Sequence, residues 1–71
     1  MKEIKISKEP AELCKVLKLT GLVQSGGEAK HLISEGQVEL NGEIELQKRK
    51  KIVSGDVIGF SNEKFSILLK P

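Results

Sequence analysis

Hydrophobic residues near the start of the chain recur at spacings of three and four, which predicts a helix over residues 10–20. The residues of its apolar face are Leu13, Val16, Leu17 and Thr20. We expect Pro10 in the first turn, where proline is favoured, and Gly21 just past the end in a left-handed conformation. Cys14 falls inside this pattern and is expected to be a buried structural thiol.

A second helix is predicted over residues 26–35, and its buried face consists of Ala29, Leu32 and Ile33. Ser25 and Glu28 have the spacing of a capping box, in which the serine oxygen accepts from the amide three residues on and the glutamate reaches back. Gly36 is the expected end of this helix. Because the link between the two helices is short, they form an αα-hairpin.

From Gln37 onward the hydrophobic period changes to two, which predicts strands. Asn41-Gly42 is a strong hairpin signal, and the apolar residues that alternate around it are Val38, Leu40, Ile44 and Leu46. A strict two-residue loop would set Leu40 opposite Glu43 and mix core with solvent positions on one face. We therefore predict an odd-length loop with a glycine bulge, which pairs apolar residues with apolar ones.

Further strands are expected at both ends of the chain. Residues 2–6 alternate in polarity and predict a short edge strand, and residues 57–60 and 65–69 predict two more. Ser54-Gly55-Asp56 and residues 61–64 are predicted turns. Ile52 and Val53 are expected to return the chain to the core.

The length of 71 residues allows one domain, residues 1–71. A domain of this size buries only about 60 % of the surface of its unfolded chain, which leaves no room for a deep catalytic cleft. No apolar run approaches the ~20 residues of a membrane span, and the start of the chain does not resemble a signal peptide. We therefore expect a cytoplasmic protein with no membrane contact.

The sequence shows no catalytic or metal-binding arrangement. A single cysteine excludes an internal disulfide and a cysteine-rich zinc site. Ser25 has no suitably spaced His–Asp partner, and the only histidine, His31, has no evident acidic partner. We expect a protein that is not an enzyme and uses neither cofactor nor metal.

Charge is concentrated in one short segment, although the net charge is only +2. Residues 1–47 hold six lysines and eight glutamates, a balance of −2, and residues 52–71 are balanced. Lys48-Arg49-Lys50-Lys51, the basic tetrad, adds +4 and so exceeds the net charge of the whole chain. A local positive field of this kind attracts a polyanion.

Several short motifs follow one another from about Ala11 to Phe60. They are Leu17…Gly21, Ser25…Ala29-Lys30, Leu32-Ile33, Gly36-Gln37-Val38-Glu39-Leu40-Asn41-Gly42 and Gly55-Asp56-Val57-Ile58. In order and spacing they resemble the S-four-type RNA-binding domain, a family named for a small-subunit ribosomal protein. The brevity of the chain is similar to that of the stand-alone bacterial members.

The resemblance implies an α+β fold, in which a two-helix hairpin packs on a small, curved, mainly antiparallel β-sheet, the alpha-L RNA-binding motif. It implies a non-catalytic monomer that binds structured RNA, ribosomal or tRNA-like, through the helices and the adjoining sheet loops. Many members place a phosphate-binding arginine immediately after the serine, where this chain has Gly26.

Two segments have a physical reason to bind phosphate. The Ser25-Gly26-Gly27 turn opens a helix, so its free amides and the helix dipole favour an anion; an ordinary helix cap is the equal alternative. The basic tetrad would release counterions and relieve its own repulsion on a polyanion, and Arg49 suits bidentate phosphate contact. The alternative for the basic tetrad is a solubilising loop or a guard of a strand edge.

Other polar residues extend this candidate surface. Lys30 matches a basic position of the family, and Lys15, Lys18 and His31 lie on the same two helices, although each could be a solvated side chain without a role. The candidate RNA-binding residues are Lys15, Lys18, Ser25, Gly26, Gly27, Lys30, His31, Asn41, Lys48, Arg49, Lys50 and Lys51.

The aromatic residues limit the kind of RNA. Phe60 and Phe65 are the only two, and both occupy apolar strand positions. Because proteins that bind single strands stack bases on exposed aromatic side chains, we expect recognition of folded or double-stranded RNA with low sequence specificity.

Two other classes of protein compete with RNA binding as an interpretation of the sequence. A ubiquitin-like sulfur carrier shares the Val-Asn-Gly and Gly-Asp patterns but needs a free terminal Gly-Gly, whereas this chain ends Leu69-Lys70-Pro71. A protein-interaction adaptor with a basic surface remains open.

Overall fold

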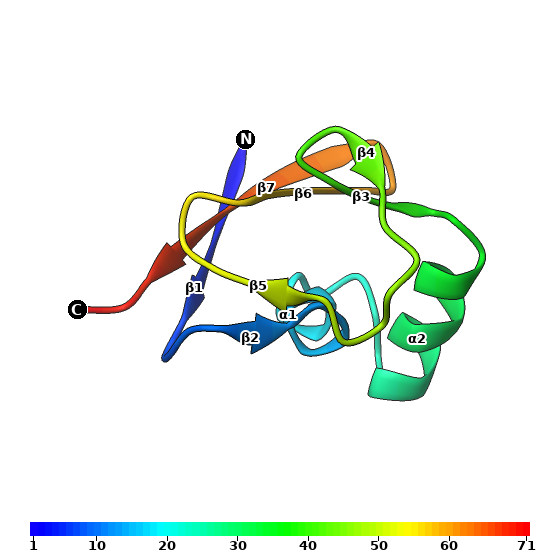
Figure 1. The fold of residues 1–71 in the computed structure, drawn as a ribbon, viewed down its shortest axis with the longest axis horizontal. Coiled ribbons are helices and arrows are strands. Elements are labelled where there is room, and N and C mark those ends of the chain that lie inside the picture. The colour runs from blue at the N-terminus through cyan, green and yellow to red at the C-terminus, as the bar shows by residue number, and fades with distance from the viewer.

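Two helices cover one face of a five-stranded sheet in the computed structural model, which describes residues 1–71 (Figure 1). In chain order the elements are β1 (Lys2–Ile6), β2 (Ala11–Glu12), α1 (Leu13–Leu19), α2 (Gly26–Ser34), β3 (Val38–Leu40), β4 (Glu43–Ile44), β5 (Lys51–Ile52), β6 (Val57–Phe60) and β7 (Glu63–Leu69). No helix has the length and apolar character needed to cross a membrane.

The main sheet has the strand order β1-β7-β6-β3-β4. β1 runs parallel to β7, and the other neighbours are antiparallel, so the predicted α+β fold with a mainly antiparallel sheet is confirmed. The predicted edge strand at residues 2–6 is β1. β2 and β5 pair with each other in a separate two-stranded sheet beside α1.

One core joins the helices to the sheet, and all of its 15 buried residues are hydrophobic. The side chains with no exposed surface include Leu13, Val16, Leu17, Ala29, Ile33, Val38, Ile52, Ile58 and Ile67. Most of the predicted apolar face of each helix is therefore buried, as is Cys14, whereas Thr20 and Leu32 are half-buried. Val53 is 42 % exposed, so the prediction that it returns to the core was wrong; Ile52 alone points inward from β5.

The first helix is shorter than predicted and begins at Leu13. Residues 11 and 12 are extended as β2, because they pair with Ile52 and Lys51 of β5. Pro10 therefore precedes a strand and lies outside the helix, after a cis Glu9–Pro10 bond. The tertiary pairing overrode the local preference of proline for a first helical turn.

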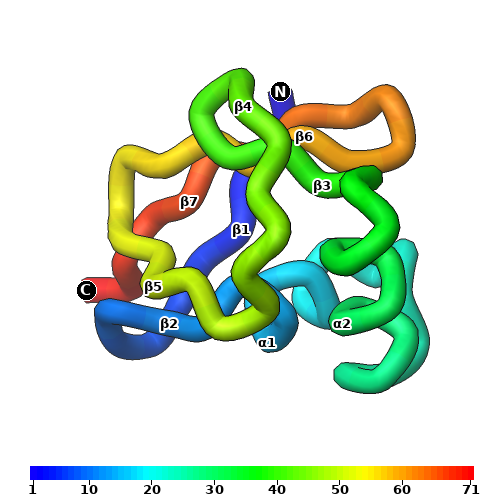
Figure 2. Tube along the Cα trace, turned by 45° about the vertical axis from the view of Figure 1, so that its right-hand side comes forward, coloured from blue at the N-terminus to red at the C-terminus, as the bar shows by residue number.

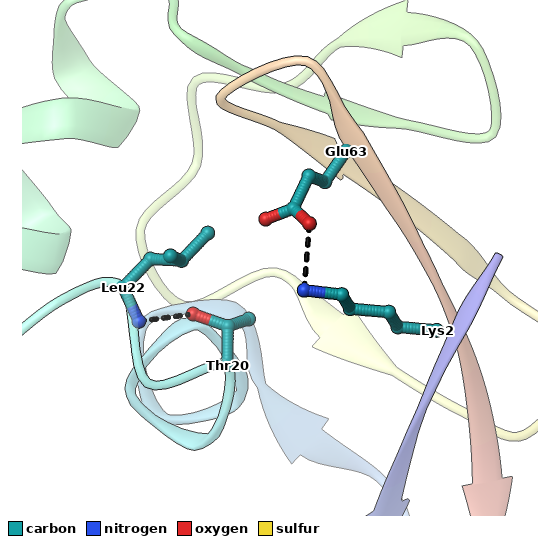
Figure 3. A network of polar contacts seen from close by, with 4 residues as sticks. All are labelled: Lys2, Thr20, Leu22 and Glu63. Carbon is teal, nitrogen blue, oxygen red and sulfur yellow. Dashed lines mark hydrogen bonds and ion pairs between the residues drawn. The ribbon is translucent and has the colours of Figure 1, made fainter.

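The end of α1 is closed by Thr20, as Figure 3 shows. The Thr20 hydroxyl donates to the Leu17 carbonyl at 2.7 Å. It also accepts from the Leu22 amide at 3.1 Å, the bond drawn in Figure 3. Gly21 then adopts the predicted left-handed conformation, with φ of 81°.

Figure 3 also shows the ion pair of Lys2 with Glu63, 2.7 Å long, which joins β1 to the start of β7. Because β7 begins at Glu63, the predicted turn over residues 61–64 is limited to its first two residues.

The β3–β4 hairpin has a strict two-residue loop. Leu40 pairs with Glu43, and Glu39 pairs with Ile44, so the predicted odd-length loop was wrong. Asn41 and Gly42 both have positive φ, 54° and 89°, which matches the twist of a two-residue hairpin turn. The favourable turn geometry therefore set the register, and it left Ile44 63 % and Leu46 59 % exposed.

Candidate nucleic-acid interface

The basic tetrad forms a tight turn and the strand that follows it. The Lys50 amide donates to the Gln47 carbonyl at 3.2 Å, which places Lys48 and Arg49 at the tip of the turn. Lys51 is the first residue of β5. Lys48, Arg49 and Lys51 are exposed, and Lys50 is half-buried.

The backbone of the basic tetrad is attached to the start of α1. The Leu13 amide donates to the Lys50 carbonyl at 2.9 Å, and the Cys14 amide donates to the Lys48 carbonyl at 3.1 Å. Figures 1 and 2 both show the chain coming down from β4 and turning at the beginning of α1. These bonds satisfy two helix amides that otherwise lack acceptors, and they fix the position of the cationic turn.

The side chains of the basic tetrad form no ion pair within the protein. Of the three ion pairs in the structure, none includes a residue of the basic tetrad. The nearby Glu45 carboxylate instead accepts from the Gln47 amide at 3.1 Å. Lys50 and Lys51 share a surface hollow with Glu43, Glu45 and Asp56, so their charge is partly offset, whereas Lys48 and Arg49 at the tip of the turn lie outside that hollow.

The start of α2 has the predicted cap. The Ser25 hydroxyl accepts from the Glu28 amide at 3.1 Å. The Glu28 carboxylate reaches back one residue further than a capping box predicts and accepts from the Gln24 amide at 2.8 Å. The amides of Gly26 and Gly27 belong to the first turn and have no acceptor within the helix.

The Lys18 side chain extends from α1 to the start of α2. A Cβ added to Gly26 would lie 4.0 Å from Cδ of Lys18, so the lysine stem runs beside this glycine. Lys30 is one helical turn beyond Gly26 on the same side of α2 and is half-buried. Lys18 and the free amides therefore lie together, with Lys30 on the same side of α2. The basic tetrad is held at the opposite end of α1.

Two other candidate RNA-binding residues, Lys15 and His31, have an acidic neighbour. The Lys15 ammonium lies 3.9 Å from a Glu12 carboxylate oxygen. His31 Nε2 lies 3.4 Å from Glu35 Oε1, so the prediction that His31 lacks an acidic partner was wrong. Both neighbours are one helical turn away, a spacing that the sequence already contained.

Asn41 is engaged within the fold. Its Nδ2 donates to Asp56 Oδ1 at 3.1 Å, and its Oδ1 accepts from the Val57 amide at 2.9 Å. Asp56 Oδ2 also accepts from the Val53 amide at 3.0 Å. The Asn-Gly and Gly-Asp motifs, 15 residues apart, therefore hold each other in place, a link that separate turn motifs do not reveal.

Comparison with known proteins agrees with this architecture. A family model described as an S4 domain matches residues 4–68. The chain belongs to the S4 domain family. The predicted resemblance to the S-four-type domain is therefore confirmed, and the match extends beyond the span from about Ala11 to Phe60 that the motifs indicated.

Bacterial relatives align with this chain over most of their own length. The protein named "Putative RNA-binding protein YbcJ" of Escherichia coli is 41 % identical over 69 residues, which cover 96 % of this chain and 99 % of the relative. The protein named "Probable ribosome maturation protein RlbA" of Bacillus subtilis is 40 % identical over 55 residues, 78 % of each chain.

A solved structure confirms the fold of this S4 domain. The solution structure of YbcJ from E. coli, described as revealing an αL motif involved in RNA binding, superposes with a TM-score of 0.72 at 40 % identity. The alignment covers 96 % of this chain and 87 % of the YbcJ chain. The helical hairpin and mainly antiparallel sheet are thus features shared with that motif.

Proposed function

We propose that this protein is a non-catalytic, monomeric RNA-binding protein of the cytoplasm that contacts the phosphate backbone of structured RNA. The names of two relatives, an RNA-binding protein and a ribosome maturation protein, support RNA as the partner and ribosomal RNA as the first class to test. The proposed surface combines the basic tetrad with Lys18, Lys30 and the Ser25-Gly26-Gly27 turn, flanked by Lys15 and His31.

The observation that carries the proposal is the attachment to α1 of a basic tetrad that forms no ion pair. Its backbone bonds the Leu13 and Cys14 amides, while its four cations form no ion pair. A fixed group of free cations suits the regular phosphate spacing of a folded RNA, and each contact releases counterions. The half-buried Lys30 and the Gly26 amide offer further phosphate contacts beside Lys18.

Folded RNA is the preferred class because no aromatic platform is exposed. Phe65 is 1 % exposed and Phe60 is 9 % exposed, and the chain has no tyrosine or tryptophan. Single-strand recognition by base stacking therefore lacks its usual side chains. Shape and backbone charge then determine binding, as they do for most double-stranded RNA.

Replacement of the basic tetrad by four alanines tests the proposal. The bonds to α1 come from backbone carbonyls, so alanine retains them and the fold is preserved. Titration of an RNA stem-loop over a range of salt concentrations should show weaker binding. The slope of log K against log salt should flatten by roughly 0.7–0.9 for each lost phosphate contact.

A charge-matched variant controls for net charge. Alanine at the exposed lysines Lys5, Lys8, Lys64 and Lys70 removes the same number of charges from outside the proposed surface. This variant should retain most of the affinity. An equal loss in both variants, or an unchanged salt slope in the basic tetrad variant, would contradict the proposed surface and favour a protein-interaction adaptor.

A further inference from the structure

Two large apolar side chains of the β3–β4 hairpin face solvent. The two-residue turn pairs Ile44 with Glu39, and Glu39 projects from the face of β3 opposite to the buried Val38. Ile44 is 63 % exposed, and Leu46, two residues further along the chain, is 59 % exposed. Exposed apolar groups that cluster in this way mark interaction sites more often than isolated ones do.

The end of α2 adjoins these side chains. Cγ2 of Ile44 lies 3.9 Å from the position that a Cβ on Gly36 would occupy. Ile44 therefore lies over a residue with no side chain, and the surface there is smooth. We call Gly36, Ile44 and Leu46 the hairpin patch.

Acidic residues surround the hairpin patch. Glu35 precedes Gly36 in sequence, and Glu39 is the cross-strand partner of Ile44. Glu43 and Glu45 are the residues immediately before and after Ile44. Glu39 and Glu43 form no ion pair. Lys50 and Lys51 of the basic tetrad line the hollow beside Ile44, but the four glutamates outnumber them. The net charge around the hairpin patch is therefore negative and favours lysine and arginine side chains of a partner.

We propose that the hairpin patch is a docking site for a basic protein, one that presents an apolar side chain flanked by lysine or arginine. Ile44 and Leu46 are the apolar anchors, and the glutamates form a charged rim of the opposite sign to the partner. A second copy of this chain is a poor occupant, because a symmetric contact would bring the two glutamate rims together. The inference does not rest on RNA binding, since the hairpin patch shares no residue with the proposed RNA surface.

Two synthetic peptides provide the test. One has leucines flanked by arginines, and in the other serine replaces each leucine. Titrated into the isotope-labelled full chain, the leucine peptide should shift the amide signals of Gly36, Glu39 and residues 43–46. It should also bind at least tenfold more tightly than the serine peptide.

The variant with Ile44→Ser and Leu46→Ser should bind the leucine peptide at least tenfold more weakly. Both side chains are exposed, so the fold is expected to survive. The matched control carries Leu68→Ser and Leu69→Ser, which are also exposed but lie in β7, and it should bind as the wild type does. Equal affinity for the two peptides, or an unaffected hairpin variant, would overturn the proposal.

Two further measurements separate the other occupants. If the hairpin variant also loses tenfold in affinity for an RNA stem-loop, the hairpin patch belongs to the RNA surface and the protein-docking proposal fails. If sedimentation shows a concentration-dependent dimer that the variant abolishes, the occupant is a second copy and the proposal also fails. A failure of the proposed RNA function would instead appear in the basic tetrad variant and leave the peptide titration unchanged.

Discussion

At the scale of single residues, Gly26 is notable because nothing in its surroundings requires glycine. Its φ is not in the left-handed region, and an added Cβ would have only ordinary contact with Lys18 at 4.0 Å. A longer side chain can therefore be accommodated at the start of α2 without strain. In the proposed interface, phosphate would be contacted here by the amides and by the neighbouring lysine.

Gly26→Arg should consequently increase affinity for a structured RNA. One added charge-assisted hydrogen bond to phosphate corresponds to roughly a tenfold gain at moderate salt. Binding to an RNA stem-loop measures it, with Gly26→Gln as the control of similar length and no charge. Equal affinities of the two variants would place phosphate away from the start of α2.

Asn41→Ala tests whether this residue supports the fold or touches RNA. The change removes the bonds to Asp56 and Val57 and should lower the free energy of unfolding by about 1–3 kcal/mol. Asn62→Ala is the matched control, since Asn62 also has positive φ, 63°, in a two-residue turn but its side chain forms no hydrogen bond within the protein. Denaturant unfolding measures the difference between the two variants. A loss of RNA affinity in folded Asn41→Ala, with no loss of stability, would make it a direct contact.

At the scale of elements, local signals identified what each segment is, and tertiary contacts decided where it begins and how it pairs. Most of the apolar face of each helix, the cap at Ser25 and the glycine ends were predicted correctly, because each depends on neighbours within one turn. The start of α1 was not, since it depends on pairing with β5, about 40 residues away. The hairpin register was wrong because turn geometry outweighed the burial of Ile44.

The same distinction between local signals and tertiary contacts applies to the candidate site. Clustering of the basic tetrad is visible in the sequence, but its carbonyl bonds to Leu13 and Cys14 are not. Contact of Lys18 with Gly26 likewise depends on how α1 packs on α2. The kinds of residue in the surface could be predicted, whereas their attachment to one another could not.

Ser25→Ala tests the start of α2 as an element. Loss of the hydroxyl that accepts from the Glu28 amide should cost about 1 kcal/mol of stability. Ser34→Ala is a suitable control at the other end of the helix, where the hydroxyl donates to the His31 carbonyl and caps no free amide. Thermal unfolding followed by circular dichroism should show the larger drop for Ser25→Ala, and equal drops would contradict the capping role.

At the scale of the whole molecule, the chain has one small core and no polar group inside it. Stability of a domain this size is only a few kcal/mol, so the loss of one large core side chain is comparable to the total. The two proposed surfaces also differ in charge, with free cations at the start of α1 and glutamates around the β3–β4 hairpin. They meet at the hollow that Lys50 and Lys51 share with Ile44 and its flanking glutamates, but they consist of different residues and can be altered separately.

Phe65→Ala should unfold the protein. Truncation of a buried phenylalanine costs about 3–5 kcal/mol, which exceeds or matches the expected stability. Leu68→Ala, at an exposed position of the same strand, should have little effect. Loss of amide signal dispersion distinguishes the two, and a folded Phe65→Ala protein would show that the core is more tolerant than its size indicates.

The carbonyls of Lys48 and Lys50 also affect the entropy of ligand binding at the cationic turn. Because they hold the first amides of α1, the turn cannot loosen without also releasing the beginning of that helix. The turn is therefore already ordered before a polyanion binds it. Binding then does not include most of the entropic cost of ordering a mobile loop. By mass action, the same ligand should raise the melting temperature of the whole domain.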